Sequence, residues 1–407
     1  MTNTEILISG GGIAGPALAY WLHRAGFSVT LVERAPAPRP GGQTVDLRGA
    51  GRTVVTRMGL MEQVRARTVE QRGLALVNTA GRTTATVPED AFGGEGIISE
   101  IEILRGDLAD VLHQATRHDV EYLFDDSVTD LRQDEHGVTV TFEKAAPRRF
   151  ALVVGADGLH SVVRRLAFGP EQQLVRPLGL YNAWFTTTEP LQLDGWYKMF
   201  NAPGGLVAAA RPGRLPGEVK ASLSFRTAEP LGYDRRDTAA QRELLARRFA
   251  GVGGWEVPAL LRAMRTAPDF TFDPMGQVHL DSWSRGRTVL LGDAGYCATP
   301  LTGLGTSLAL VGAYVLAGEL AAAAGDHHAA FRAYDRTMRP YVDQAQELPP
   351  GGAKGYAPSS ALAIRLRAAS MRSMTRWPMR TILAAQFAKA GNIALPDYRL
   401  PSAARAA

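Results

Sequence analysis

The strongest constraint on the fold is a glycine-rich segment that begins at residue 10. Gly10, Gly12 and Gly15 occupy the glycine positions of the pattern G-x-G-x-x-G. The apolar run 5–9 predicts a strand directly before this segment, and the pattern of 16–25 predicts a helix directly after it. A strand that enters a helix through such a turn is typical of the first half of a βαβ unit, with a right-handed crossover and parallel strands.

The turn has the chemistry of a dinucleotide site. Gly12 lets a pyrophosphate approach the backbone, and Ile13 and Ala14 lead into a helix whose N-terminus offers N–H donors and a positive dipole end. A second predicted strand, 27–33, ends at Glu33, where a carboxylate can accept hydrogen bonds from an adenosine ribose. Because a phosphorylated ribose would be repelled there, we expect FAD or NAD; an ordinary surface carboxylate is the alternative.

Two later segments also run from a strand into a turn and a helix. The first continues a predicted strand ending at 154 into Asp157 and Gly158. The second continues the buried run 288–291 into a Gly-rich turn and a long predicted helix over 306–324. Either segment alone is only a strand-to-helix turn. Together, behind the N-terminal glycine pattern, they indicate one composite site.

On these residues the chain resembles the class A flavoprotein monooxygenases, which include p-hydroxybenzoate hydroxylase and the tetracycline-inactivating monooxygenases. The likeness covers residues 4 to about 345, and 41–47 is similar to a segment of the tetracycline-inactivating branch. Tyr296 and the side chains at 304, 306 and 307 depart from residues common in the family. The residues that resemble the Asp-Gly and Gly-Asp motifs are Asp157, Gly158, Ser161, Arg164, Gly292, Asp293, Pro300 and Gly305.

The resemblance implies a set of cofactor contacts. Arg105 would lie beside the FAD phosphates, Asp293 would bind the ribityl chain, and Asp157 would act in both FAD and NAD(P)H binding. Backbone N–H groups of 300–305 would stabilise negative charge on the flavin. The full implied FAD-binding set is Gly10, Gly12, Ile13, Ala14, Gly15, Glu33, Arg34, Asp46, Arg105, Asp157, Gly158, Gly292, Asp293, Pro300, Gly303, Leu304 and Gly305.

The same resemblance implies an α/β fold. We expect a Rossmann-like FAD-binding domain with an inserted antiparallel-sheet substrate domain and a C-terminal helix, since 407 residues exceed what one core usually supports. The helix is expected over 359–389, packing across the two domains. The expected boundaries are 1–75, 98–169 and 272–350 for the FAD-binding domain, 76–97 and 170–271 for the substrate domain, and 351–407 for the C-terminal segment.

The function implied is that of a monooxygenase with FAD and NAD(P)H as cofactors. It would hydroxylate a small aromatic, polyketide or tetracycline-like molecule with dioxygen, through a flavin C4a-hydroperoxide. One glycine pattern implies that NAD(P)H binds without a Rossmann domain of its own, and Arg39 is either a flavin or nicotinamide contact or a solvated loop residue. The alternatives are a flavin reductase or oxidase, and a non-catalytic flavin-binding sensor or ligand-sequestering protein. A flavin halogenase is disfavoured because the Trp-x-Trp-x-Ile-Pro signature of that group is absent.

The substrate is expected between the flavin and the inserted sheet. Aromatic side chains in such a sheet are as readily plain core residues as ligand contacts. The candidate substrate residues are Tyr181, Trp184, Met199, Phe200, Arg211, Phe225 and Arg226.

Composition narrows the partners. The net charge of +5 comes from dispersed basic residues, which argues against nucleic acid. A single cysteine, Cys297, and a start without a signal-peptide pattern predict a cytoplasmic protein, and no histidine spacing predicts a metal site. The apolar stretch 308–324 is interrupted by Glu319 and suits a buried helix better than a membrane span. We therefore expect no membrane partner, and a monomer or weak homodimer.

Overall fold

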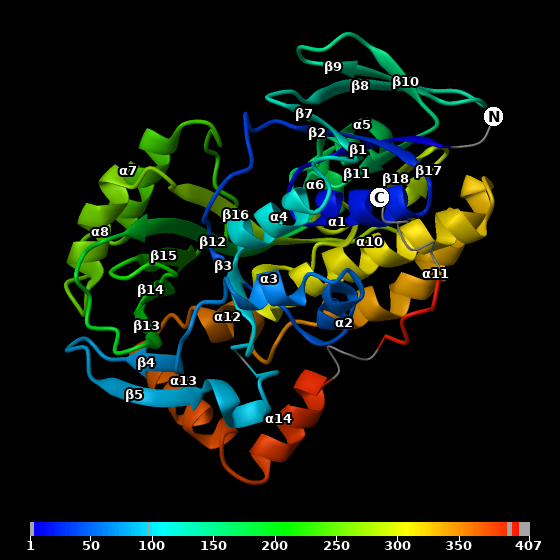
Figure 1. Ribbon diagram of the computed structural model, residues 1–407. Coiled ribbons are helices and arrows are strands. Elements are labelled where there is room, and N and C mark those ends of the chain that lie inside the picture. The colour runs from blue at the N-terminus through cyan, green and yellow to red at the C-terminus, as the bar shows by residue number, and fades with distance from the viewer. Residues whose placement is uncertain (1–3, 97, 389–392, 399–407) are drawn as a thin grey trace.

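The computed structural model describes residues 4–96, 98–388 and 393–398. Two large sheets lie beside each other, and helices cover them (Figure 1). The C-terminal helices lie at one end of the molecule, below the second sheet in the view of Figure 1. The expected α/β fold, with an FAD-binding half, a sheet-based second half and a helical C-terminal region, is confirmed.

The first large sheet is six-stranded and mostly parallel. Its strands in spatial order are β17 (Ser284–Arg285), β18 (Thr288–Leu290), β11 (Leu152–Gly155), β1 (Glu5–Ser9), β2 (Ser28–Glu33) and β7 (Glu121–Phe124). β17 is antiparallel to β18, and the other pairs are parallel, with Ile8 opposite both Val154 and Leu31. The carboxyl ends of β1, β11 and β18 therefore meet at one edge, where ligands bind in open α/β sheets.

Alternating side chains place this sheet between two layers. Ile6 and Ile8 belong to the main core, which the helices complete, and Leu7 belongs to a separate core formed with a small antiparallel sheet. The helices on the first face are α1 (Ala14–Arg24), α10 (Gly305–Ala322) and α11 (His327–Ala345), and the strands of the small sheet are β8 (Val128–Gln133), β9 (Val138–Phe142) and β10 (Arg148–Phe150). Among the described residues, α10 alone is long and apolar enough to cross a membrane, and 72% of it is buried inside the protein.

Shorter elements connect these layers. The connecting elements are β3 (Thr44–Asp46), which pairs with β6 (Glu102–Leu104), and α2 (Gly49–Arg57), α3 (Met61–Arg65), α4 (Arg105–Gln114), α5 (Val162–Phe168), α6 (Glu171–Leu174), α9 (Asp293–Tyr296) and η2 (Pro300–Thr302). Gly59, which adopts φ +74°, lies between the end of α2 at Arg57 and the start of α3 at Met61.

The second large sheet is seven-stranded. It is antiparallel except where β4 pairs with β13. Its strands β4 and β16 include residues on both sides of the domain boundaries expected at 75/76 and 271/272, and these boundaries stay predictions. Its strands in order are β16 (Thr271–Val278), β12 (Val175–Thr187), β15 (Val219–Arg226), β14 (Leu206–Pro212), β13 (Trp196–Ala202), β4 (Gly73–Val77) and β5 (Thr83–Pro88). The helices α7 (Thr238–Arg248) and α8 (Val257–Thr266) cover one face, and η1 (Glu89–Phe92) follows β5.

The C-terminal region corrects one expectation. In place of a single helix over 359–389, it forms α12 (Gly352–Tyr356), α13 (Ala361–Met374) and α14 (Met379–Ala388). Pro378, which has no N–H group, separates the last two helices. α13 buries Ala368 and Met371 against the second sheet, whereas 393–398 reaches α10, where the Tyr398 hydroxyl bonds Glu319 at 2.6 Å. The contact with the first half is thus made by this last stretch of chain.

Candidate functional site

The three glycine-rich segments meet at the carboxyl edge of the six-stranded sheet. A Cβ atom on Gly10 would lie 2.4 Å from the carbonyl oxygen of Ala156, and a Cβ atom on Gly292 would lie 3.2 Å from the Cβ atom of Ala14. The first segment therefore touches both of the others. Segments that are far apart in the sequence are packed so closely that only glycine fits at the first of these contacts.

Within the first segment the glycines have different roles. Gly10 adopts φ +115°, and a Cβ atom on Gly15 would lie 2.0 Å from the Gly10 carbonyl oxygen, so both glycines are required by the protein itself. A Cβ atom on Gly12 would meet only Nη2 of Arg105, at 3.1 Å. Ile13 begins α1 without a side-chain cap. A pyrophosphate could therefore bind above Gly12. The N–H groups at the start of α1 and the guanidinium group of Arg105 would both donate to it.

Glu33 stands at the end of β2 and fixes the turn. One carboxylate oxygen accepts from the N–H group of Gly11 at 2.7 Å, and the other accepts from that of Ala35 at 2.9 Å. Each oxygen can accept a further hydrogen bond, so these contacts are compatible with a ribose at the same carboxylate. Arg34 and Arg39 follow in the loop, and both are exposed.

Arg105, the first residue of α4, brings the predicted charges together. Its side chain is open to water yet surrounded by protein on most sides, and this loss of solvation lowers the pKa of the guanidinium group. The positive charges of Arg39 and Arg34 lower it further, whereas Asp293 and Glu33 raise it. Five of the predicted site residues therefore act on one another electrostatically.

The Asp-Gly segment is built around the start of α5. The Asp157 carboxylate accepts from the Ser161 hydroxyl and, at 2.8 Å, from the N–H group that follows Ser161. Burial raises the pKa of Asp157, and these donors lower it. Gly158 adopts φ +81°, and buried Arg164 donates to the carbonyl oxygen of Ala294 at 2.9 Å. The motif thus holds its own helix and ties it to the third segment.

The Gly-Asp segment delivers the N-terminus of α10 to the same place. A Cβ atom on Gly305 would lie 3.8 Å from Oδ1 of Asp293, and Leu304 precedes the helix without a side-chain cap. The N–H group of Gly303 donates to the Pro300 carbonyl oxygen at 3.2 Å. The N–H group of Thr302 likewise donates to the Thr299 carbonyl oxygen at 3.3 Å, so the donors left for a ligand belong to the start of α10. The protein around the Asp293 carboxyl group removes most of its solvation, and this raises the pKa of Asp293.

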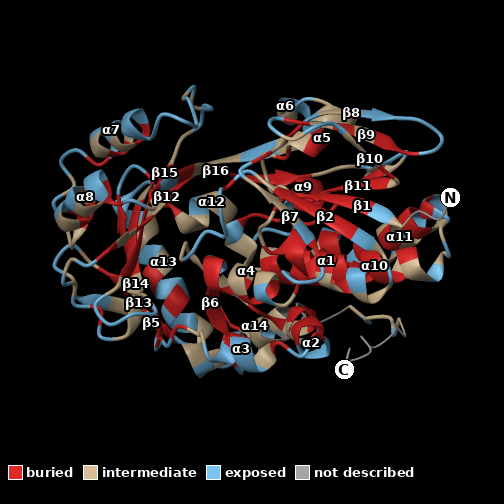
Figure 2. Ribbon diagram, turned by 45° about the horizontal axis from the view of Figure 1, so that its top comes forward, coloured by how far each residue is buried: buried red, intermediate tan, exposed pale blue. Residues whose placement is uncertain are grey.

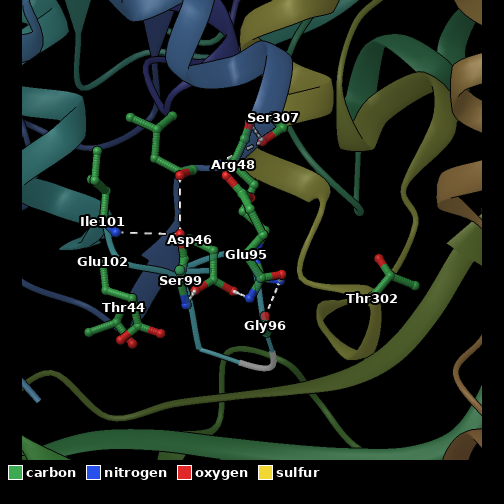
Figure 3. A network of polar contacts seen from close by, with 12 residues as sticks. Thr44, Asp46, Arg48, Glu95, Gly96, Ser99, Ile101, Glu102, Thr302 and Ser307 are labelled. Atoms are coloured by element: carbon green, nitrogen blue, oxygen red, sulfur yellow. Dashed lines mark hydrogen bonds and ion pairs between the residues drawn. The ribbon is translucent and has the colours of Figure 1, made fainter. Parts of the chain in front are cut away.

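A polar network fixes Asp46 against this turn (Figure 3). Asp46 forms an ion pair with Arg48 at 3.0 Å, and a Cβ atom on Gly303 would lie 3.1 Å from Oδ2 of Asp46. The Ser307 hydroxyl donates to the carbonyl oxygen of Arg48 at 3.0 Å. Sequence reasoning missed Arg48 and Ser307. The only signal was that Ser307 departs from the family pattern, and the structure shows that it holds β3 to α10.

The seven-stranded sheet separates the substrate candidates by face. Tyr181, Phe200 and Phe225 belong to the core that α7 and α8 cover, and the rings of Tyr181 and Phe225 stack at 5.6 Å. This face points away from the FAD-binding half, as the alternation of side chains along a strand requires. The structure therefore places these three residues in the core, and a contact between them and the substrate stays a prediction.

Arg211 lies on the opposite face and reaches the FAD-binding half. Its guanidinium group contacts Glu102 of β6 and the hydroxyl of Thr44 in β3, and stands 4.7 Å from the centre of the Tyr197 ring. Burial lowers the pKa of Arg211 to about 10, and Asp46 opposes the shift. Arg211 is the predicted substrate residue that connects the seven-stranded sheet to the two-stranded sheet of β3 and β6.

The remaining candidates share this face but lie elsewhere on it. Met199 accepts from the Arg367 guanidinium group of α13 at 3.2 Å, and Arg226 donates to the carbonyl oxygen of Ala357 at 3.2 Å, so both are covered by the C-terminal region. Trp184 is partly buried in the same apolar cluster as Leu301 of the Gly-Asp turn. Trp184 and Arg211 are thus the candidates that the structure brings next to the predicted flavin segments.

Two further features of the described chain bear on chemistry. No group of three or more His, Cys, Asp or Glu side chains that could hold a metal ion occurs within residues 4–96, 98–388 and 393–398. Cys297 is buried beside Asp293, and burial raises the pKa of its thiol, so a thiolate is disfavoured there.

Comparison with known proteins matches most of the chain to one family. Residues 3–348 match the family described as FAD binding domain. An uncharacterized protein of Mycobacterium tuberculosis is 47% identical over 357 residues, which cover 87% of this chain and 94% of that protein. A flavin-dependent monooxygenase of Legionella longbeachae is 38% identical over 346 residues, covering 85% and 87%.

A solved structure extends the similarity over nearly the whole chain. The tetracycline destructase Tet(55) superposes with a TM-score of 0.80 at 35% identity, covering 97% of this chain and 99% of its own. The match includes the C-terminal helical region in addition to both large sheets. The sequence resemblance to the tetracycline-inactivating branch is thereby confirmed.

Proposed function

Because the chain belongs to the FAD-binding family of flavin-dependent monooxygenases, and is thus an oxidoreductase, we propose that it uses NAD(P)H and dioxygen to hydroxylate a small organic molecule. The substrate class that we propose is aromatic, polyketide or tetracycline-like. The observation that carries this proposal is the convergence of Gly12, Arg105, Asp293 and the start of α10 opposite Arg211.

The residues present fit an FAD molecule. A pyrophosphate would lie over Gly12, with the N-terminus of α1 on one side and Arg105 on the other. Glu33 would bind the ribose with the lone pairs that Gly11 and Ala35 leave. We propose that Asp293 binds the ribityl chain, because its carboxyl group lies between Arg105 and the start of α10.

The start of α10 would act on the flavin ring. FAD, when bound, supplies electron transfer from NAD(P)H and the activation of dioxygen, which no side chain provides. The uncapped N–H groups after Leu304 would stabilise negative charge on the ring. Asp46 and Ser307 would hold this turn in place, since both belong to the network that joins β3 to α10. These backbone donors do not depend on the side chains that differ from the family pattern.

The substrate would lie between this turn and the second sheet. We propose Arg211 and Trp184 as its contacts on the sheet, because Arg211 reaches Thr44 and Glu102, and Trp184 packs against the same apolar cluster as Leu301 of the turn. We propose that exposed Arg39 contacts NAD(P)H, and that Asp157 acts on both cofactors by holding Gly158 and α5 in position.

A substrate screen tests the proposal. The purified protein should oxidise NAD(P)H slowly alone and faster with a suitable phenol, polyketide or tetracycline, and the product should contain one added oxygen atom. A reductase or oxidase would consume NAD(P)H without changing the mass of any substrate, and a binding protein would not oxidise NAD(P)H.

A further inference from the structure

Exposed apolar side chains are concentrated in the last two helices. Seven large hydrophobic residues are exposed among the described parts of the chain, and five of them lie between 362 and 382. Their exposed fractions range from 39% for Met379 to 85% for Trp377. The five residues are Leu362, Leu366, Trp377, Met379 and Ile382. So strong a bias toward one short segment is the pattern of an interaction surface.

The same segment is strongly basic. Residues 351–396 contain no Asp or Glu, whereas they include five arginines between 365 and 380. Four of these, Arg365, Arg372, Arg376 and Arg380, are exposed, and within the described residues none of the four forms an ion pair. Arg372 donates one hydrogen bond, to the Thr84 carbonyl oxygen at 2.8 Å. The positive charge of this surface is therefore not neutralised by the protein.

On α13 the two kinds of residue lie next to each other. Leu362 and Leu366 are one helical turn apart on the face opposite buried Ala368 and Met371, and Arg365 lies beside them. Beyond α13, Trp377 lies between Arg376 and Arg380 in the sequence where the chain turns into α14. Both helices lie at the lower end of the molecule in the view of Figure 1, and Figure 2 draws them largely in the colours of exposed and intermediate residues.

We propose that this surface, the C-terminal face formed by Leu362, Leu366, Trp377, Met379 and Ile382 with Arg365, Arg372, Arg376 and Arg380, docks on an anionic lipid bilayer. Apolar side chains and tryptophan enter the boundary between head groups and acyl chains, and arginines bind lipid phosphates. The sequence-based expectation of no membrane partner rests on the absence of a membrane-spanning segment. Docking needs no spanning segment.

Charge argues against the other occupants. A second copy of the chain would place the same arginines opposite one another in a two-fold contact, and like charges across an interface cost several kcal/mol. A nucleic acid would neutralise the arginines but would leave the leucine and isoleucine side chains in water. An anionic bilayer can bind the arginines through lipid phosphates and bury the apolar side chains at the same time.

Vesicle binding of the FAD-loaded full chain tests this proposal. The protein should sediment with vesicles of equal parts phosphatidylglycerol and phosphatidylcholine at low salt, and at least about tenfold less with phosphatidylcholine alone. Binding should be lost in about 1 M NaCl, where the Debye length falls to about 3 Å. The fluorescence of Trp377 should shift to shorter wavelength on binding, and Trp377→Phe should bind without that shift.

A matched pair of variants isolates the charges. Arg376→Gln with Arg380→Gln should weaken vesicle binding about thirtyfold, at about 1 kcal/mol per arginine. Arg332→Gln with Arg336→Gln, an exposed pair at the same spacing on α11, should leave it unchanged. Equal losses in both pairs, or no binding to phosphatidylglycerol vesicles at low salt, would show that the proposal is wrong. So would a dimer in sedimentation equilibrium that Leu366→Glu dissociates.

Discussion

The guanidinium group of Arg105 stands over the backbone of Gly12, so that the first atom of any side chain added at Gly12 would lie 3.1 Å from Nη2. Apart from the chain neighbours of Gly12, no other atom of the described residues lies within 4 Å of that position. The glycine at residue 12 is therefore not needed for packing, in contrast to Gly10 and Gly15. Because Gly12 has no side chain, the space between its backbone and the guanidinium group of Arg105 stays open.

This difference gives the first prediction. Gly12→Ala should leave the apoprotein as stable as the wild type, because only the mobile end of Arg105 must shift, but it should abolish the yellow colour of bound FAD. Gly15→Ala should unfold the protein, since its Cβ atom would lie 2.0 Å from the Gly10 carbonyl oxygen. Absorbance at purification and thermal unfolding measure the two effects. Gly232→Ala, with open space around it, is the control; FAD retained by Gly12→Ala would contradict the assignment.

The second prediction concerns the two charged side chains at this site. Arg105→Ala and Asp293→Ala should each weaken FAD binding by about 1–3 kcal/mol, because each removes a hydrogen bond to a polar group of the cofactor. Titration of the apoprotein with FAD measures the change. Arg262→Ala on α8, which is exposed and lies on the other half, should bind FAD like the wild type. Unchanged affinity in both site variants would show that the assigned contacts are wrong.

Local features of this fold could be predicted from the sequence. Strand, turn and helix follow one another within 5–24, and their order is fixed by residues that are neighbours in the chain. Each of the three glycine-rich motifs predicts a turn from residues that are close in the sequence, and Glu33 marks the end of a strand in the same way. Since the ends of parallel strands meet at one edge, three local turns suffice to predict a common site.

Other features depend on contacts that no local pattern contains. Tyr181 and Trp184 lie on one strand, but an odd separation places them on opposite faces, and only the packing of α7 and α8 decides which face is core. Ser307 and Arg48 are joined across the chain, so neither motif revealed the other. Leu362 and Leu366 have helical spacing typical of a packed face, yet α13 buries Ala368 and Met371 on its opposite face.

The third prediction tests the pair Arg211 and Glu102, which joins the seven-stranded sheet to the two-stranded sheet of β3 and β6. Arg211→Met should destabilise the fold by about 3–5 kcal/mol, because it leaves the buried Glu102 carboxylate without its partner. Adding Glu102→Gln should restore most of that stability. If Arg211 also contacts substrate, the double variant should fold and bind FAD normally while its KM stays raised. Denaturant unfolding and steady-state kinetics separate the two roles, and a double variant with normal KM would assign Arg211 to structure alone.

The fourth prediction is a pH dependence of stability at His160, which contacts Glu171 at 3.1 Å and, from the second sheet, Asp273 at 3.3 Å. Burial of the ring lowers its pKa, but the hydrogen bonds to Asp273 and Glu171 outweigh burial and raise the pKa overall. The stabilising charged form is therefore fully present below the ordinary pKa of about 6.5 and is lost as pH rises through the raised value.

Thermal unfolding across this range provides the measurement. The Tm of the wild type should exceed that of His160→Gln at acid pH, and the difference should shrink as the pH rises. His136→Gln, in an exposed turn of the small sheet, should follow the wild type at every pH. A difference that stays constant with pH would mean that His160 contributes packing and no charge.

The last prediction concerns the reaction itself. With labelled dioxygen, the substrate that best stimulates NAD(P)H oxidation should gain one labelled oxygen atom, because the chain offers one dinucleotide fold and a helix N-terminus at the predicted flavin ring. Mass spectrometry of the product and a peroxide assay measure how the consumed oxygen divides. Ser307 and the side chains at 304 and 306 differ from the family pattern, so a fold match alone does not fix this outcome. The donors before α10 belong to the backbone, however, and Ser307 keeps that turn in place through Arg48. Oxygen recovered entirely as hydrogen peroxide, with an unlabelled substrate, would identify an oxidase built on a monooxygenase fold.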